Sequence, residues 1–332
     1  MKVISLFTGC GGADQGIIGG FEYLGVRYAK TQFQILHASD IDAKAIATYN
    51  LNFKHKGEVS DVKQLDFKHL KGEVDVVVGG FPCQSFSSVN PTKDPTDDRS
   101  QLFNEMLRIV RQVRPKYVIG ENVQGFYRLH NGIYFEDYCR KLRRAGYEVH
   151  HQILTASDYG IPQHRKRLFI VGVRKNIMGC FSFPRPTHGP NSPKNLPFVP
   201  LESVIQELKD VPEKYFFSQR AVEGVKKAKN NMKRALAQDL SKPSLTITSH
   251  LAKVSLNSRD PVLLVDPDKE TYRRFTPSEA AEIQSFPHSF EFAGSEADAY
   301  RQIGNAIPPV LMWHLIRELQ KFDRSSTSSV GG

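Results

Sequence analysis

Val3-Ile4-Ser5-Leu6-Phe7-Thr8-Gly9-Cys10-Gly11-Gly12 is an apolar run that ends in a glycine cluster, and residues 13–24 continue it with apolar residues at helical spacing. This pattern predicts a strand over residues 3–7 and a helix over residues 13–24. A strand that passes through glycines into a helix lets backbone N–H groups approach a ligand closely. As a dinucleotide fingerprint the stretch is imperfect, because Asp14 stands where G-x-G-x-x-G has its third glycine. An acid there suits a cationic or zwitterionic ligand better than a pyrophosphate, and a tight turn without a ligand is the alternative.

Outward from this stretch, strand and helix patterns alternate along the first half of the chain. The uniformly apolar residues 74–78 indicate a strand that is buried on both faces. Residues 102–113 carry a single apolar stripe at helical spacing. The other expected strands are 33–38, 117–120, 149–154 and 168–173, and the other expected helices are 42–50 and 135–145. Such alternation predicts an α/β fold with a doubly wound, mostly parallel sheet.

The alternation stops near Phe181, and six prolines between residues 183 and 200 indicate a boundary. Residues 220–242 are markedly basic, and helical patterns return at 277–284 and 309–322. We therefore expect a first unit over 1–185, a smaller second unit over 186–272, and a segment, 273–323, that returns to the first unit. The Ser- and Gly-rich end, 324–332, is expected to be disordered.

Composition limits the classes of partner. The 332 residues carry 45 Lys and Arg against 35 Asp and Glu, a net charge of +10 that favours a polyanion, nucleic acid before anionic membrane. The 4 cysteines lie far apart, which argues against a zinc site and against a disulfide scaffold. No apolar run approaches the ~20 residues that span a bilayer. The start turns polar too soon for a signal peptide, so we expect a cytoplasmic protein without a membrane partner.

A second glycine-containing loop carries the residues best suited to chemistry. Gly79-Gly80-Phe81-Pro82-Cys83-Gln84-Ser85-Phe86-Ser87 follows the buried strand at 74–78, which brings Cys83 to a carboxyl end of the sheet, where open α/β sheets bind ligands. Glu121 ends the next expected strand, and Arg165 and Arg167 precede another. A thiol, a carboxylate and two guanidinium groups at one edge suit nucleophilic addition to an electron-poor ring.

Six segments of the chain resemble, in order, the motifs of the DNA (cytosine-5)-methyltransferase family, whose bacterial restriction–modification type matches this length best. The segments are Phe7–Gly12, Pro82-Cys83-Gln84, Glu121-Asn122-Val123, Gln163-His164-Arg165-Lys166-Arg167, Arg274–Pro287 and Gly304-Asn305-Ala306-Ile307-Pro308. The resemblance implies a Rossmann-like catalytic and cofactor-binding domain (1–185, with 273–323) and a smaller target-recognition domain (186–272). It implies transfer of a methyl group from S-adenosylmethionine to C5 of a cytosine in a specific duplex DNA sequence, with S-adenosylhomocysteine as product and no metal.

The resemblance also assigns roles to the residues of the catalytic loop and its neighbours. Cys83 would add as a thiolate to C6 of the cytosine, which must be flipped out of the helix to be reached. Glu121 would hold the N3 edge and stabilise the protonated ring. Arg165 would contact the O2 edge, and Arg167 would support the loop.

The family's cofactor site maps onto residues from several expected loops. Phe7 would stack near the adenine, Asp40 would hold the ribose hydroxyls, and Asp61 would read the adenine amino group. Two departures weaken this match: Ser60 precedes Asp61 where many relatives have glycine, and Ile41 stands where some relatives carry tryptophan. The full expected set is Phe7, Gly9, Gly11, Gly12, Asp40, Ile41, Asp61, Val62, Leu102 and Asn305.

For duplex DNA, the basic second unit would contact phosphates and read bases in the major groove. Between residues 186 and 274 there are 15 Lys and Arg against 10 Asp and Glu. The expected DNA contacts are Ser85, Ser87, Gln163, Lys226, Lys227, Lys229, Arg234 and Thr246. We expect a monomer in the bacterial nucleoid, and a cognate restriction endonuclease is a candidate partner.

Other functions fit the sequence less well. A cytosine deaminase would need a second cysteine for zinc where Phe86 stands, and an NAD-dependent oxidoreductase would leave Pro82-Cys83-Gln84 unexplained. Two alternatives stay open: a tRNA cytosine-5 methyltransferase of the same family, and a non-catalytic DNA-binding regulator on the same scaffold. Intact Cys83, Glu121 and Arg165 argue against the regulator.

Overall fold

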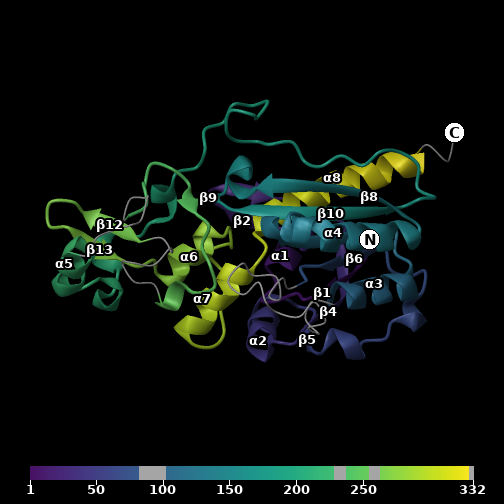
Figure 1. Ribbon diagram of the computed structural model, residues 1–332, viewed down its shortest axis with the longest axis horizontal. Helices are drawn as coiled ribbons and strands as arrows, with labels where there is room; N and C mark the ends of the chain where they lie inside the picture. Colours follow the sequence, from purple (N-terminus) through teal and green to yellow (C-terminus); the bar gives the residue numbers. More distant parts are fainter. Residues whose placement is uncertain (82–101, 228–236, 254–261, 329–332) are drawn as a thin grey trace.

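The computed structural model describes residues 1–81, 102–227, 237–253 and 262–328. Its centre is a seven-stranded sheet with the order β5-β4-β1-β6-β7-β10-β8 (Figure 1). The strands are β1 Lys2–Leu6, β4 Gln34–Asp40, β5 Glu58–Val59, β6 Val76–Gly79, β7 Tyr117–Val123, β8 Tyr147–Thr155 and β10 Lys166–Arg174. Each strand predicted from the sequence pattern lies within or overlaps one of these.

The strands from β5 to β7 pair in parallel, whereas β10 is antiparallel to both of its neighbours, β7 and β8. Six of the seven strands therefore run in one direction, and the predicted mostly parallel sheet is confirmed. Alternate residues of β6 face opposite sides: Val76 and Val78 belong to one apolar cluster and Val77 to the other. Burial on both faces explains why this strand is apolar at every position.

Helices cover both faces of the sheet. α3 (Leu102–Val113) and α4 (Ile133–Arg144) pack on the side of Val77. α1 (Gly12–Ile18) and α8 (Pro309–Ser328) pack on the side of Val76 and Val78. α2 (Ala43–Asn52) connects β4 to β5, with Asp42 as an N-cap whose side chain accepts from the backbone of Lys44. This is the doubly wound arrangement that the sequence predicts.

The first helix is shorter than its apolar spacing indicates. α1 ends at Ile18, where Gly19 and Gly20 adopt φ angles of 65° and 77°. Left-handed glycines end helices because they carry no Cβ that would clash in that conformation. Phe21, predicted to be helical, instead belongs to a hairpin of β2 (Phe21–Tyr23) and β3 (Val26–Tyr28).

The described residues of the second unit, on the left of Figure 1, contain little regular structure. They include the helix α5 (Gln219–Lys227) and the strands β11 (Ser244–Leu245), β12 (Leu263–Asp266) and β13 (Thr271–Arg273). The chain then returns through α6 (Pro277–Ile283) and α7 (Glu296–Asn305). β11 pairs with β9 (Gln163–His164), so two residues of the first unit extend into the second. Short 3₁₀ helices make up much of the remainder: η1 Val62–Gln64, η2 Lys68–Leu70, η5 Gln124–Tyr127, η6 Leu129–Gly132, η7 Ala156–Tyr159, η8 Leu201–Val204, η9 Leu208–Asp210, η10 Glu213–Tyr215 and η11 Leu251–Lys253.

The expected disorder of the C-terminal end is wrong for residues 324–328, because α8 continues to Ser328. Phe322 is buried and packs edge-on against Tyr117 and Phe181. Ser326 is also buried, and its hydroxyl donates to the Phe322 carbonyl at 2.9 Å. Packing of the helix on the sheet overrides the low propensity of a serine-rich sequence. Residues 329–332 lie outside the described residues.

None of the helices in the described part of the chain has the length and apolarity to cross a membrane.

A fully buried ion pair supports the returning segment. Both oxygens of Glu279 accept from Arg273, at 2.8 and 2.6 Å, and neither side chain is exposed. Glu279 also accepts from the backbone N–H groups of Thr276 and Gln206, and Thr276 and Glu279 form a capping box at the start of α6. One carboxylate thus connects β13, the α6 N-terminus and the segment after η8.

Replacing Glu279 with alanine should lower the free energy of unfolding by about 3 to 5 kcal/mol, because Arg273 would remain as a buried charge without a partner. Urea unfolding followed by the fluorescence of Trp313, the 1 tryptophan of the chain, measures this loss. The double variant Arg273→Met with Glu279→Leu should recover most of it. Equal losses in the single and double variants would contradict this account.

Candidate functional site

The hydrogen-bond register places four loop-forming residues at the same edge of the sheet. Leu6 of β1 pairs with Ser39 of β4 and with Gly79 of β6, and Gly79 pairs with Gly120 of β7. The residue that follows each of these four paired residues lies at the carboxyl edge of the sheet. Since neighbouring strands lie about 4.8 Å apart, these four following residues span roughly 14 Å along the edge. These next residues are Asp40, Phe7, Gly80 and Glu121.

At one end of this edge, Glu121 forms a buried ion pair with Arg167. Arg167 Nε lies 3.0 Å from Glu121 Oε1, and both side chains are almost completely buried. Burial raises the pKa of the Glu121 carboxyl, and the charges of Arg167 and Arg165 oppose that rise. Burial likewise lowers the pKa of the Arg167 guanidinium, opposed by Glu121. Antiparallel pairing of β10 with β7 sets Arg167 opposite Val123 and so brings its side chain to this edge.

Gly80 allows this carboxylate to approach the backbone. A Cβ on Gly80 would lie 3.0 Å from Glu121 Oε2. The following residue, Phe81, is held on both sides: Asn122 Nδ2 donates to its carbonyl at 3.0 Å, and its ring packs against Phe103, Phe126 and Tyr138. The chain is therefore anchored beside Glu121 two residues before Cys83. Cys83, Ser85 and Ser87 themselves lie outside the described residues.

At the other end, the first glycine turn closes on Asp40. Gly9 N donates to Asp40 Oδ2 at 2.8 Å and Asp42 N to Oδ1 at 2.9 Å. Burial raises the pKa of this carboxyl. Gly9 has a φ of 56°, and a Cβ added to it would meet no atom of the described residues within 4 Å, so these residues leave space above the turn. The neighbouring Ile41 is 72% exposed, a large apolar side chain left uncovered beside the carboxylate.

The two later glycines of the turn are needed for close packing. A Cβ on Gly11 would lie 2.4 Å from the Phe53 ring, and one on Gly12 would lie 2.6 Å from the Ile307 carbonyl oxygen. The turn is thus fixed between the end of α2 and the segment that follows α7. Asn305, the last residue of α7, is exposed.

Asp14 faces the interior rather than a ligand, contrary to the role that its place in the glycine motif suggests. It is fully buried and accepts from Ser5 Oγ at 2.7 Å, Thr8 Oγ1 at 3.0 Å and Tyr49 Oη at 2.6 Å. Burial raises the pKa of its carboxyl, and the three hydroxyl donors oppose the rise. Asp14 therefore stabilises the conformation of the glycine turn from the protein interior. The sequence showed no signal for Tyr49, which comes from α2.

Of the remaining expected cofactor residues, Asp61 and Val62 follow the strand that pairs with β4 at Asp40. Asp40 pairs with Val59 of β5, and Ser60 N donates to the Asp40 carbonyl at 3.0 Å. Asp61 follows as the N-cap of η1, with its side chain accepting from Lys63 N at 3.0 Å. Val62 is buried beneath it, and Leu102 begins α3 half-buried.

Arg165 joins two segments of backbone through three carbonyls. Its guanidinium donates to the carbonyls of Ile247 at 3.0 Å, Gly304 at 2.8 Å and Ala306 at 3.1 Å. The side chain is 1% exposed, and its Nε makes no hydrogen bond within the described part of the chain. Burial lowers the pKa of Arg165, which the nearby charge of Arg167 lowers further and that of Glu121 opposes. Arg165 therefore ties the second unit to the end of α7.

Gln163, which the sequence predicts to contact DNA, occupies the same junction. It is fully buried, its Nε2 donates to Gln284 Oε1 at 2.7 Å, and its Oε1 accepts from Ile247 N at 3.0 Å. Thr246 is half-buried and donates to the His164 carbonyl at 2.9 Å. Of the other expected DNA contacts, Lys229 and Arg234 lie outside the described residues, as do the side chains of Lys226 and Lys227.

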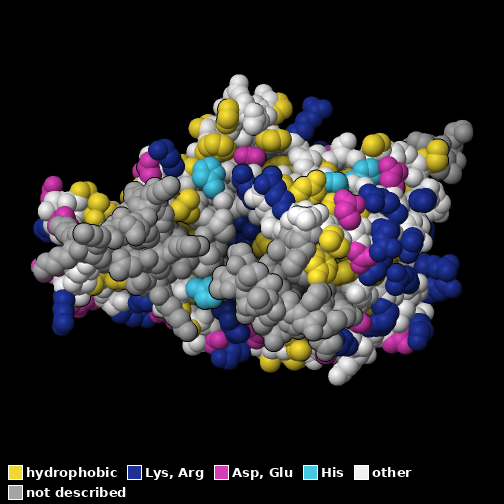
Figure 2. All heavy atoms as spheres, viewed as in Figure 1, with side chains coloured by type: hydrophobic (Ala, Val, Ile, Leu, Met, Phe, Trp, Pro, Cys, Tyr) yellow, Lys and Arg dark blue, Asp and Glu magenta, His cyan; other side chains and the backbone are white. Residues whose placement is uncertain are grey.

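Within residues 1–81, 102–227, 237–253 and 262–328, no three His, Cys, Asp or Glu side chains are grouped to hold a metal ion. The chemistry that these residues offer is that of hydrogen bonds and ion pairs. A buried carboxylate with a raised pKa and a guanidinium can together bind the polar edge of a planar heterocycle. The open glycine turn with Asp40 can hold a nucleoside. Figure 2 shows the surface hollowed between the two units, with Lys and Arg side chains in and above the hollow.

Comparison with known proteins connects this geometry to one family. A family model described as C-5 cytosine-specific DNA methylase matches residues 1–321. The chain is 30% identical to the type II methyltransferase M.NgoPII of Neisseria gonorrhoeae, over 97% of this chain and 96% of that protein. It is 31% identical to the type II methyltransferase M.BspRI of Lysinibacillus sphaericus, over 97% of this chain and 82% of that protein.

Solved structures share the fold. The chain superposes on S. pombe Dnmt2 methyltransferase with a TM-score of 0.74 and 21% identity, covering 97% of this chain and 98% of that one. It superposes on a mutant of Spodoptera frugiperda DNMT2 with a TM-score of 0.73 and 22% identity, covering 96% of this chain and 99% of that one.

The two arginines should respond differently to replacement by lysine. A single ammonium group in Arg165→Lys cannot reach three carbonyls, so we expect a loss of about 2 to 4 kcal/mol in the free energy of unfolding. In Arg167→Lys the ammonium can keep a single contact with Glu121, and the loss should stay below about 1.5 kcal/mol. Urea unfolding measures both. A larger loss for Arg167→Lys would contradict the placement of Arg165 as the structural residue of the pair.

Proposed function

The chain belongs to the C-5 cytosine-specific DNA methylase family, as its motifs predicted, and we propose how this DNA (cytosine-5-)-methyltransferase performs its reaction. In this proposal S-adenosylmethionine is the methyl donor, the substrate is a flipped-out cytosine in a specific duplex sequence, and Cys83 forms a covalent bond to C6. The observation that supports it best is the buried pair of Glu121 and Arg167 beside Gly80, three residues before Cys83.

The covalent step follows from the electron-poor cytosine ring. The Cys83 thiolate adds to C6 while Glu121, whose pKa is raised by burial, gives a proton to N3, and N3 returns this proton on elimination. Addition makes C5 nucleophilic, so that it can take a methyl group. A base, for which water suffices, then removes the C5 proton, and elimination breaks the C6–S bond and returns the Cys83 thiolate. Flipping the cytosine out costs a few kcal/mol, which contacts in the site offset.

We propose that the two arginines exchange the roles expected from the sequence. Arg167 lies against Glu121, so it can reach the O2 edge of a ring whose N3 edge faces that carboxylate. Arg165 already donates to three backbone carbonyls and is 1% exposed, which suits a positioning residue. The catalytic set in this proposal is therefore Cys83, Glu121 and Arg167, with Arg165 behind them.

The residues around Asp40 fit S-adenosylmethionine. The open space over Gly9 leaves room for a ligand, and each Asp40 oxygen keeps a lone pair for a ribose hydroxyl beyond its backbone donor. The exposed Ile41 side chain can cover an adenine face in place of tryptophan, and Asp61 is close enough in sequence and structure to read its amino group. When bound, S-adenosylmethionine supplies an electrophilic methyl group.

The second unit, 186–272, is proposed to read the target sequence, with the first unit, 1–185, and 273–323 carrying out catalysis. Its hydrogen bonds to the first unit through Gln163 and Arg165 hold it across the hollow seen in Figure 2. Sequencing converted genomic DNA from cells that express the chain would identify the recognition sequence. Methylation of tRNA instead of DNA would contradict the duplex substrate.

Duplex DNA that carries 5-fluorocytosine at the target should form a stable covalent adduct with the protein in the presence of S-adenosylmethionine. Fluorine at C5 cannot leave as a proton, so elimination is blocked after methyl transfer. Mass spectrometry of digested adduct should locate the bond at Cys83. Cys83→Ala should form no adduct and still bind DNA, and an adduct in this variant would refute the assigned nucleophile.

Replacing Glu121 with glutamine should lower kcat by about 10²- to 10⁴-fold, because the amide neither shares the N3 proton nor balances Arg167. DNA affinity, measured by fluorescence anisotropy, should change little. The matched control is Glu148→Gln, which makes the same charge change at an exposed residue of β8. A kcat for Glu121→Gln equal to that of Glu148→Gln would contradict the role of Glu121.

A further inference from the structure

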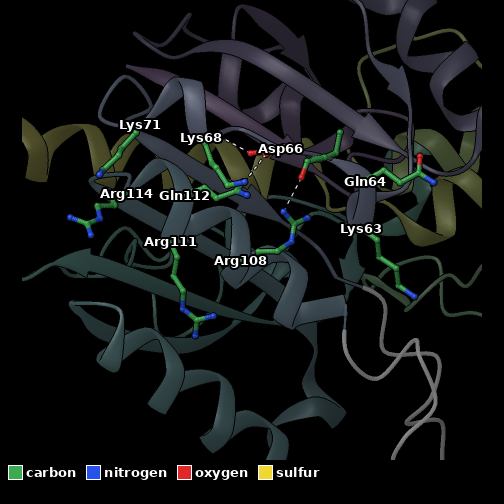
Figure 3. A pocket seen from close by; sticks show the side chains of 10 residues that line it. Lys63, Gln64, Asp66, Lys68, Lys71, Arg108, Arg111, Gln112 and Arg114 are labelled. Carbon is green, nitrogen blue, oxygen red and sulfur yellow. Dashed lines mark hydrogen bonds and ion pairs between the residues drawn. The ribbon is translucent and has the colours of Figure 1, made fainter.

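A second concave surface lies outside the site described above. A groove of about 890 Å³ runs between α3 and the segment that contains η1 and η2 (Figure 3). Figure 3 shows Lys71, Arg111 and Arg114 toward one end and Lys63 and Gln64 toward the other. We call it the basic groove, and its lining is Lys63, Gln64, Leu65, Asp66, Lys68, Lys71, Arg108, Arg111, Gln112 and Arg114.

The two walls of the basic groove are held together by hydrogen bonds that are already in place. Arg108 of α3 donates to the carbonyls of Leu65 at 2.9 Å and Val62 at 2.8 Å. Gln112 Oε1 accepts from Phe67 N at 3.1 Å. The inward face of α3 packs into the core through residues such as Met106 and Val110, which are fully buried. The groove is therefore a fixed feature of the fold and presents its cations without rearrangement.

The charge of the basic groove is unbalanced. Six of its ten lining residues are Lys or Arg and one, Asp66, is acidic. Asp66 pairs with Lys68, and Glu105 pairs with Arg108. Lys71, Arg111 and Arg114 form no ion pair with any carboxylate of the described residues. The helix dipole stabilises the positive charge of Arg111 in the last turn of α3, but it does not stabilise that of Lys71, which lies outside α3 on the opposite wall.

The lining is also wrong for a small apolar ligand. Ligand pockets are lined predominantly by apolar side chains with a few polar groups, whereas Leu65 is the one apolar residue of this lining. Gathered cations of this kind raise the local potential and attract polyanions. The 12 residues of α3 extend for about 18 Å, along which one strand of B-form DNA carries about five phosphates.

The basic groove begins where the catalytic edge ends. One wall starts at Lys63, two residues after Asp61, and the other is formed by the second half of α3 from Arg108 onward and by Arg114. Figure 2 shows Lys and Arg side chains gathered on the visible face at the end of the molecule where Figure 1 places α3. A polyanion that leaves the hollow between the units on this side would meet Lys63 first and Lys71, Arg111 and Arg114 at the other end of the groove.

We propose that the basic groove binds the phosphate backbone of duplex DNA that flanks the target site. The proposal rests on the proposed function, since it takes the duplex in the hollow as its starting point. Contacts to phosphates position DNA and carry no sequence information. The groove thus lengthens the bound segment and adds affinity for long DNA without changing which cytosine is methylated.

The test compares duplexes of 14 and 40 base pairs, each centred on the recognition sequence from converted genomic DNA. The triple variant Lys71→Gln, Arg111→Gln, Arg114→Gln should bind the 40-base-pair duplex at least tenfold more weakly at about 0.1 M salt. Its slope of log affinity against log salt should fall by about 2 to 3. Its affinity for the 14-base-pair duplex and its kcat on that duplex should stay within twofold of the unsubstituted protein.

The matched control removes three exposed cations from elsewhere, with Arg27→Gln, Lys30→Gln and Lys321→Gln. An equal loss in this control, or an equal loss on the short duplex, would overturn the proposal, as would unchanged affinity for the long duplex. A loss seen only with a 40-base-pair RNA duplex would assign the basic groove to RNA and overturn it too. Failure of the unsubstituted protein to methylate the short duplex would instead count against the proposed function.

Discussion

The parallel pairing of β1 with β4 on one side and β6 on the other is the constraint on which the rest of the structure depends. Because Leu6 is in register with Ser39 and Gly79, the loops that follow β1, β4 and β6 begin at the same edge of the sheet. The pairing of β6 with β7 brings Glu121 to this edge as well. The glycine turn, Asp40 and the segment leading to Cys83 owe their proximity to this ladder rather than to contacts among their side chains. A one-residue slip of β1 would turn its buried side chains to the wrong faces and separate these groups.

The sequence predicted the sheet well because its strands are buried on both faces and its helices carry one apolar stripe, patterns that depend on local spacing alone. It did not predict that β10 runs antiparallel, since the direction of a strand leaves no mark on its composition. It placed Phe21 in a helix, because apolar spacing continued past Gly19 and Gly20 although the backbone turned there. Motif order proposed the site residues as a set, whereas the roles that we propose for Arg165 and Arg167 depend on which carbonyls lie within reach, and that is a tertiary property.

Polar side chains are buried where the two units meet. Gln163, Arg165 and Gln284 satisfy backbone groups of Ile247, α6 and α7 at a place where side chains from both units meet. Such groups are costly to bury unless every partner is present, so they specify a single arrangement of the segments. This arrangement explains why residues that are dispersed over the sequence together support the edge.

The placement of Asp40 and Arg167 at opposite ends of the edge has an electrical consequence. Carboxylates of Asp40 and Asp61 mark the end near β4 and β5, whereas at the other end the carboxylate of Glu121 is paired with Arg167. The unbalanced negative charge of the edge is therefore concentrated at the end near β4. In the proposed reaction, this charge would attract the positive sulfonium group of the cofactor before any short-range contact forms.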